Sequence, residues 1–318
     1  MTDGHYLAYY ELHEIPWESP APVRFKDNED GTIFELGRGP YHVPRMASPT
    51  VVVHAGGARI ETVNENYVLE GGTYFGMAVP VRLSEEKGSP LVEPGFEQLR
   101  RLTEDAARVV GLCLDQRIPL KLVAAYIKES RDNGKPRMLT LWQVRSGGAA
   151  SVSHQSVESI RVALSSALSA EVSPQVQLAL RWYDLSKNAT VGPDRLVALW
   201  IALEAIMAPV NSHAALVRKT STHLAGANYG LGLNPEHIRI AIGFDRMLEY
   251  RNQIMHRGSW PVPWPVVPGD PERRDWPQIL CDVVGEMLRQ RLGAPLTGAL
   301  ARHASEGAKM QEDNGTNR

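Results

Sequence analysis

Residues 196 to 207 read LVALWIALEAIM, an apolar run in which Glu204 is the one charged residue. Apolar side chains recur along it at the spacing of one helical face: Leu196, Leu199, Trp200, Leu203 and Met207. Pro193 stands just before the run, in the first turn, where a proline is compatible with a helix. We therefore predict a helix over Pro193 to Met207 that faces the core of a helical bundle.

Stripes of the same kind occur on both sides of this run. They predict further helices over Ser156 to Leu168, Pro174 to Lys187, Ser212 to Ala225, Pro235 to Arg257 and Asp275 to Leu292. Between the last two, residues 259 to 271 (SWPVPWPVVPGDP) hold too many prolines for a helix. We expect an all-α bundle over residues 152 to 303, followed by a polar, disordered tail over residues 304 to 318.

The first half of the chain has a different pattern. Short β-branched and aromatic runs, separated by Gly, Pro and Asn, predict strands over His5 to His13, Thr50 to His54, Arg59 to Val63, Tyr74 to Leu83, Leu120 to Ile127 and Met138 to Val144. One helical stripe covers Gly95 to Asp115. The predicted fold class is a two-domain α+β protein, with a β-rich domain over residues 1 to 147 that senses or regulates.

Composition restricts the functional classes. The 318 residues carry a formal net charge of -2, so any nucleic-acid binding must come from a local patch. The two cysteines, Cys113 and Cys281, lie far apart without a zinc-binding spacing, and we expect both to be reduced and inert. No metal or cofactor is predicted. No apolar run is long enough to span a membrane, and the start MTDGHYLAYYELHE does not resemble a secretion signal, so we expect a cytoplasmic protein.

One arginine occupies an unusual position. On an ideal helix over Pro235 to Arg257 the following apolar residues share a face: Ile240, Phe244, Met247 and Met255. Arg251 falls in the middle of that face. Because an unpaired buried charge is destabilising, it needs a partner, and Glu204 is the first candidate and Glu249 the second. Such a pair would explain Arg251 as a purely structural residue.

The polar residues that follow Arg251 suggest chemistry. Asn252 and His256 lie four residues apart and share one edge of the helix, whereas Arg251 and His256 diverge by about 140°. The two can meet on one ligand only if the helix ends or bends near His256, or if a second subunit completes the site.

Three segments together resemble a known family: RWYDLS (Arg181 to Ser186), LVALWIALEAIM (Leu196 to Met207) and EYRNQIMHRG (Glu249 to Gly258). They look like the ApeA-like branch of the HEPN domain superfamily, over roughly residues 155 to 303. The resemblance implies a metal-independent endoribonuclease that acts as a homodimer, often a toxin or an anti-phage abortive-infection effector. Its products would be 2',3'-cyclic phosphate and 5'-hydroxyl ends, and a cognate antitoxin or a phage-derived trigger would control it.

The resemblance also assigns residues. Arg251, Asn252 and His256 match the catalytic motif, and Glu204 matches a supporting acidic position. Histidine suits proton transfer near neutral pH, and arginine suits stabilisation of a charged phosphate. The alternative is a catalytically inactive HEPN module that binds a nucleotide or a partner protein.

Weaker candidates for RNA contact are Arg257 and a basic helix that holds Arg218 and Lys219 together with His213 and His223. For this helix, a solvated face is the favoured explanation. The glycine-rich residues 226 to 232 lack a preceding strand and a phosphate-loop motif, so we interpret them as a turn.

Overall fold

The structure is a computed structural model that describes in full residues 35–37, 101–118, 156–168, 172–189, 191–258 and 274–309, and elsewhere gives the backbone of further helices and strands. The chain divides into two compact units. Unit 1 comprises residues 1–110 and 118–161, and unit 2 comprises residues 111–117 and 162–318. The boundary predicted at residues 147 to 152 lies outside the described residues.

In unit 1 the backbone forms short antiparallel ladders. The strands are β1 (Thr2–Glu11), β2 (Val23–Lys26), β3 (Ile33–Arg38), β4 (Tyr41–Met46), β5 (Thr50–His54), β6 (Gly57–Glu61), β7 (Asn64–Leu69), β8 (Thr73–Leu83), β9 (Leu120–Glu129), β10 (Arg137–Met138) and β11 (Val144–Arg145). Strand β1 pairs with β8 and β9, β3 pairs with β8 and β2, and both β10 and β11 pair with β9. Strands β4 and β7, and β5 and β6, form separate pairs.

The predicted fold class, an α+β protein with a β-rich first domain, is wrong for the residues described in full. Those residues are 76% helical, with one lone strand segment, Glu35–Gly37, and no sheet. A fold class is defined by layers packed around a core, and the core shown by described side chains is almost entirely helical. Runs of alternating β-branched residues predict strands. They do not by themselves predict that these strands pack into a sheet with a core of its own.

Helix α1 (Val92–Cys113) agrees with the helix predicted over Gly95 to Asp115. Its last turn and the following loop, residues 111–117, belong to unit 2. There the Arg289 guanidinium donates to the carbonyl oxygen of Leu112, and the Lys187 ammonium lies 2.6 Å from an Asp115 carboxylate oxygen. Unit 2 thus holds this helix end with cations, which favourably oppose the negative end of the helix dipole.

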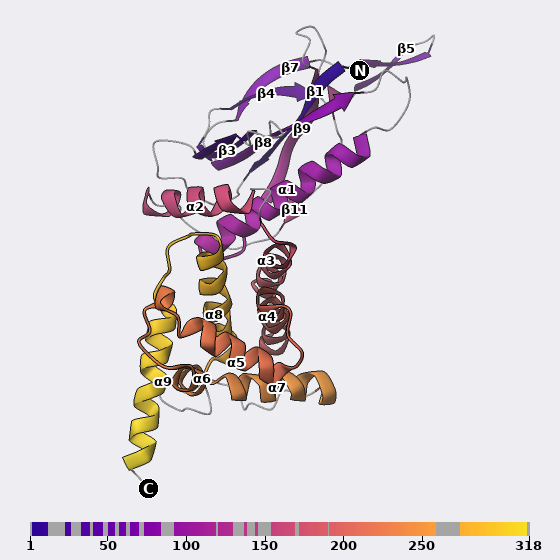
Figure 1. Ribbon diagram of the computed structural model, residues 1–318. Helices are drawn as coiled ribbons and strands as arrows, with labels where there is room; N and C mark the ends of the chain where they lie inside the picture. Colours follow the sequence, from indigo (N-terminus) through magenta and orange to yellow (C-terminus); the bar gives the residue numbers. More distant parts are fainter. Residues whose placement is uncertain are drawn as a thin grey trace. The chain divides into compact units, whose positions relative to one another are not determined.

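The rest of unit 2 is helical. Its helices are α2 (His154–Ala167), which begins in unit 1, α3 (Pro174–Ser186), α4 (Gly192–Met207), α5 (His213–Leu224), η1 (Ala227–Tyr229), α6 (Pro235–Ile242), α7 (Phe244–Arg257), α8 (Trp276–Arg291) and α9 (Ala299–Thr316). Helices α3, α4 and α8 pack along one another, and α5, α6 and α7 gather at one end of this group (Figure 1). Trp200 of α4 and Phe244 of α7 are among the largest fully buried side chains.

Local sequence explains where several of these helices begin. Side chains accept hydrogen bonds from backbone N–H groups of the first turn in α3, α5, α6 and α8, and the capping residues are Ser173, Ser212, Asn234 and Asp275. A proline follows within the first two positions in α3, α6 and α8. The predicted start points of these helices are confirmed to within one or two residues.

The single helix predicted over Pro235 to Arg257 is wrong, because Gly243 divides it into α6 and α7. Gly243 has φ 82°, a left-handed conformation that glycine adopts readily. An added Cβ there would overlap the ring of Trp276, so a side chain is excluded as well. The apolar face inferred from an unbroken helix therefore does not exist, and Ile240 and Met255 are exposed by 43% and 53%.

The disordered tail predicted from residue 304 is also wrong where the structure describes it. Helix α9 continues to Thr316, and Ala304 is buried. Gly307 packs so closely on α6 that a Cβ would overlap the carbonyl oxygen of Ala241. Arg274 joins the same two helices, donating to the carbonyl oxygens of Ala241 at 2.7 Å and His303 at 3.3 Å. The small residues of α9 let it pack despite its polar sequence.

The structure bears on the predicted proline-rich loop and on the predicted absence of a membrane span to different degrees. The proline-rich residues 259 to 271 lie outside the described residues. Among the helices that the structure describes, none combines the length and apolar character needed to cross a membrane.

Candidate functional site

The predicted catalytic residues, which we call the α7 motif (Arg251, Asn252 and His256), lie in the last two turns of α7. Arg251 and Asn252 are half-buried, and His256 is exposed. The helix ends at Arg257, where Gly258 adopts a left-handed conformation with φ 62°. The predicted helix end next to His256 is therefore confirmed.

Within this motif the structure joins two of the three residues. Nη1 of Arg251 donates to Oδ1 of Asn252 at 3.3 Å. Across the described ranges, no hydrogen bond or ion pair connects either residue with His256. A helix that stays regular through Arg257 keeps Arg251 and His256 on different sides, as the helical geometry predicts. One chain alone does not bring the guanidinium and the imidazole together.

Neither carboxylate predicted for Arg251 is its partner. Glu249 instead contacts Arg246 at 3.1 Å and accepts a hydrogen bond from Gln253 at 3.3 Å. Glu204 lies 3.1 Å from Nε2 of His213. The described contacts of Arg251 therefore leave its positive charge without a carboxylate. The expected structural ion pair is wrong for both candidates.

Glu204 and His213, which we call the open pair, come from the last turns of α4 and the start of α5. The carboxylate Oε1 faces Nε2, and the two side chains are 32% and 39% exposed. Trp200 and the imidazole pack edge to face, with ring centroids 6.3 Å apart. The carboxylate and the indole together fix the ring while leaving part of it in solvent.

The basic residues predicted as weaker candidates for RNA contact differ in their surroundings. Arg218 and Arg257 are exposed, as surface cations would be. Lys219, however, donates to the carbonyl oxygens of Met207 at 2.7 Å and Pro209 at 3.3 Å. Its ammonium closes the end of α4, so it is a poor candidate for an RNA contact.

His223 contacts another side chain of unit 2. Its Nε2 lies 3.0 Å from the hydroxyl of Tyr229, which is buried. Burial, with a smaller effect of Arg291, lowers the pKa of His223, and burial raises the pKa of Tyr229 to about 12. Both groups are neutral near pH 7, and the tautomer of the imidazole sets which of the two donates. The contact holds the end of α5 to η1.

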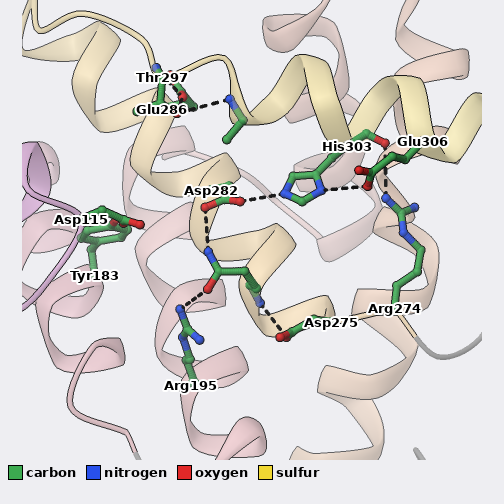
Figure 2. Close-up of polar contacts among 12 residues, drawn as sticks. Asp115, Tyr183, Arg195, Arg274, Asp275, Asp282, Glu286, Thr297, His303 and Glu306 are labelled. Atoms are coloured by element: carbon green, nitrogen blue, oxygen red, sulfur yellow. Dashed lines mark hydrogen bonds and ion pairs between the residues drawn. The ribbon is translucent and has the colours of Figure 1, made fainter. Parts of the chain in front are cut away.

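A polar network that the sequence interpretation missed lies between α4, α8 and α9 (Figure 2). Nη2 of Arg195 donates to Gln278 at 2.8 Å, and Nε2 of Gln278 donates to Oδ1 of Asp282 at 2.8 Å. The other oxygen of Asp282 lies 2.7 Å from Nε2 of His303. We call Asp282 and His303 the closed pair. The network ends near Glu306, whose Oε2 lies 3.8 Å from Nδ1 of His303.

The closed pair is placed for stability and not for chemistry on a ligand. Asp282 and His303 are 15% and 18% exposed, and Nδ1 of His303 is buried without a hydrogen-bond partner. A substrate cannot reach a nitrogen that the protein covers. The network instead positions three helices against one another.

A neighbouring carboxylate on α8 has a similar structural task. Glu286 is 2% exposed, and its Oε1 accepts hydrogen bonds from the backbone N–H of Thr297 at 2.8 Å and from the Thr297 hydroxyl. That hydroxyl accepts from the backbone N–H of Ala299 at the start of α9. Glu286 therefore fixes the turn between α8 and α9.

One sequence signal could have located this network. Gln278, Asp282 and Glu286 recur every fourth residue in a helix that is otherwise apolar on that side. Such a polar edge inside a buried helix indicates partners from neighbouring helices, because buried polar groups need hydrogen bonds. The identity of those partners, Arg195 and His303, depends on packing between distant segments.

The described residues contain no group of three or more His, Cys, Asp or Glu side chains that could hold a metal ion. Cys113 and Cys281 are free thiols. Burial raises the pKa of Cys113 to about 11, with Arg289 opposing the rise, so its thiol stays protonated and unreactive near neutral pH.

Comparisons with protein-family models, with curated proteins and with solved structures gave no significant match. The candidate site therefore rests on its own geometry and on the sequence resemblance described above.

Proposed function

We propose that unit 2 is a metal-independent endoribonuclease of the HEPN type, in which Arg251, Asn252 and His256 act on the RNA phosphodiester. The observation that carries the proposal is the half-buried Arg251 guanidinium, which contacts an amide and no carboxylate among its described contacts. A cation without a counter-ion is available to a phosphate oxygen, and its planar donors suit that geometry.

His256 supports the same proposal through its position. The imidazole is exposed at the end of α7, beside the exposed Arg257, so an RNA strand can reach both side chains. Because Arg251 and His256 point in different directions on one helix, a second copy of α7 in a homodimer would bring the complementary group. Such an enzyme would act as a toxin or an anti-phage effector, with unit 1 sensing a trigger.

The test is RNA cleavage by the purified full chain in the presence and absence of EDTA. We expect cleavage in both conditions, with 2',3'-cyclic phosphate and 5'-hydroxyl ends. Arg251→Ala and His256→Ala should each lower the rate by at least about 100-fold, the usual effect of losing an acid-base group or a charge stabiliser.

Two matched controls separate chemistry from folding. Arg246→Ala removes an arginine of the same helix that already pairs with Glu249, and His237→Ala removes an exposed histidine of α6. Both should cleave RNA at the wild-type rate. A wild-type protein that leaves RNA intact with and without EDTA would contradict the proposal.

One observation favours the second candidate, a catalytically inactive module that binds a nucleotide or a partner protein. Among the described residues of one chain, no hydrogen bond or ion pair joins Arg251 and His256, and an arginine without a carboxylate partner can bind a phosphate without cleaving it. Calorimetric titration with ATP and with inorganic phosphate would then give heat that Arg251→Ala abolishes, while RNA stays intact.

A further inference from the structure

A reaction at the α7 motif needs two proton-transfer groups, and within one chain α7 supplies one histidine. When the 2'-hydroxyl oxygen attacks phosphorus, its proton must go to a base. When the bond between phosphorus and the 5'-oxygen breaks, that oxygen must receive a proton from an acid. The cyclic phosphate and the 5'-hydroxyl then form without a further reactant. A second imidazole would supply the other proton-transfer group.

We propose that His213, held by Glu204, is the second acid-base group of the RNA-cleaving site. This inference rests on the proposed function and assigns a residue that the sequence resemblance does not. His213 would act on the substrate directly, and Glu204 would act as a positioning residue through it.

The geometry of the open pair carries the inference. The Glu204 carboxylate holds Nε2 at 3.1 Å, and no nitrogen of His213 is buried without a partner, in contrast with Nδ1 of His303. An imidazole fixed by a carboxylate on one nitrogen and accessible at the other has the arrangement that proton transfer requires. Among the described residues, Glu204 is the one charged group within ion-pair distance of His213.

The helices that carry the open pair pack on the helix that carries the α7 motif. Helix α4, which carries Glu204, contacts both α5 and α7, and α5 contacts α7 as well. In Figure 1 α5 and α7 lie at one end of the group formed by α3, α4 and α8. The closed pair, by contrast, belongs to α8 and α9.

The experiment measures kcat/KM between about pH 5 and 9 on a mixed-sequence RNA oligonucleotide that carries a fluorophore and a quencher. A base and an acid acting together give a bell-shaped profile. We expect this profile for the wild-type protein. His213→Gln should lower kcat by about 100-fold and remove one limb, and added imidazole should restore part of the activity of His213→Ala.

Glu204→Gln keeps the imidazole and removes its anchor. We expect kcat to fall by roughly tenfold while KM stays unchanged, since proton transfer suffers and RNA binding does not. His303→Gln is the matched control, because it breaks a carboxylate–imidazole contact whose second nitrogen is covered. It should retain the wild-type profile.

The outcomes distinguish this inference from the proposed function. An active wild-type protein whose His213→Gln variant keeps the full rate and both limbs overturns the role of His213 and leaves the α7 motif standing. A wild-type profile with a single limb overturns it too. A wild-type protein without RNA cleavage overturns the proposed function itself.

Discussion

Unit 2 contains two carboxylate–histidine pairs with similar contacts and opposite surroundings. The open pair, Glu204 and His213, is about one-third exposed, whereas the closed pair, Asp282 and His303, is largely covered. In both, a carboxylate oxygen faces Nε2 of the imidazole. What differs is the second nitrogen, which the closed pair buries. The comparison shows that burial, and not residue type, decides whether such a pair stabilises the fold or is available to a ligand.

The largest expected effect comes from Gly243, which ends α6 and begins α7. Gly243→Ala should lower the free energy of unfolding by about 3 kcal/mol, because a left-handed alanine is strained and its Cβ would overlap Trp276. Urea unfolding measures the loss. Gly258→Ala is the control, since φ is 62° there and no atom lies within 4 Å of an added Cβ. It should cost about 1 kcal/mol, and equal losses would show that the overlap is unimportant.

A smaller effect should separate the two pairs directly. Asp282→Asn and His303→Gln should each lower the free energy of unfolding by about 1 to 3 kcal/mol, because they leave buried polar groups unsatisfied. Glu204→Gln and His213→Gln should each change it by less than about 1 kcal/mol, as exposed pairs do. Urea midpoints of the four variants make the comparison. If the open-pair variants were the more destabilised, Glu204 and His213 would be structural.

The smallest effect concerns His223, a half-buried histidine without a carboxylate partner in the described region. Because burial lowers its pKa, the folded state binds fewer protons than the unfolded state below about pH 6.5. Its contribution to stability is therefore present above that pH and is lost as the pH falls. His223→Gln should flatten the decrease in the unfolding midpoint between roughly pH 7 and 5.

His237→Gln, which changes an exposed histidine of α6, is the control for that measurement. It should leave the acid sensitivity of the unfolding midpoint as in the wild-type protein. A steeper acid dependence in His223→Gln would mean that the protonated form of His223 is the one that the fold favours.

Sequence patterns located most of the helical unit but not its interruptions. The stripes over α3, α4, α5 and α8 predicted these helices closely, since periodicity and capping are local properties. The break at Gly243 was missed because an isolated glycine is tolerated in many helices, and here Trp276, far along the chain, excludes a side chain. The predicted tail was wrong because Gly307 packs on Ala241, a contact between distant residues.

For the candidate site too, the positions along one helix were predicted correctly, whereas a contact between helices was not. The sequence placed Arg251, Asn252 and His256 on one helix that ends beside the histidine, and the structure agrees. It paired Glu204 with the wrong residue, because the choice between Arg251 and His213 depends on how α4, α5 and α7 pack.

By itself, the sequence determined where α3, α4, α5, α6 and α8 begin, because capping and periodicity follow from interactions among neighbours along the chain. Only the tertiary structure decided that Arg251 contacts an amide and no carboxylate, that Glu204 holds His213, and that Asp282 and His303 close a covered network. Partner choice among polar side chains depends on distances between segments remote in sequence, and the burial of each group then sets whether it can meet a ligand.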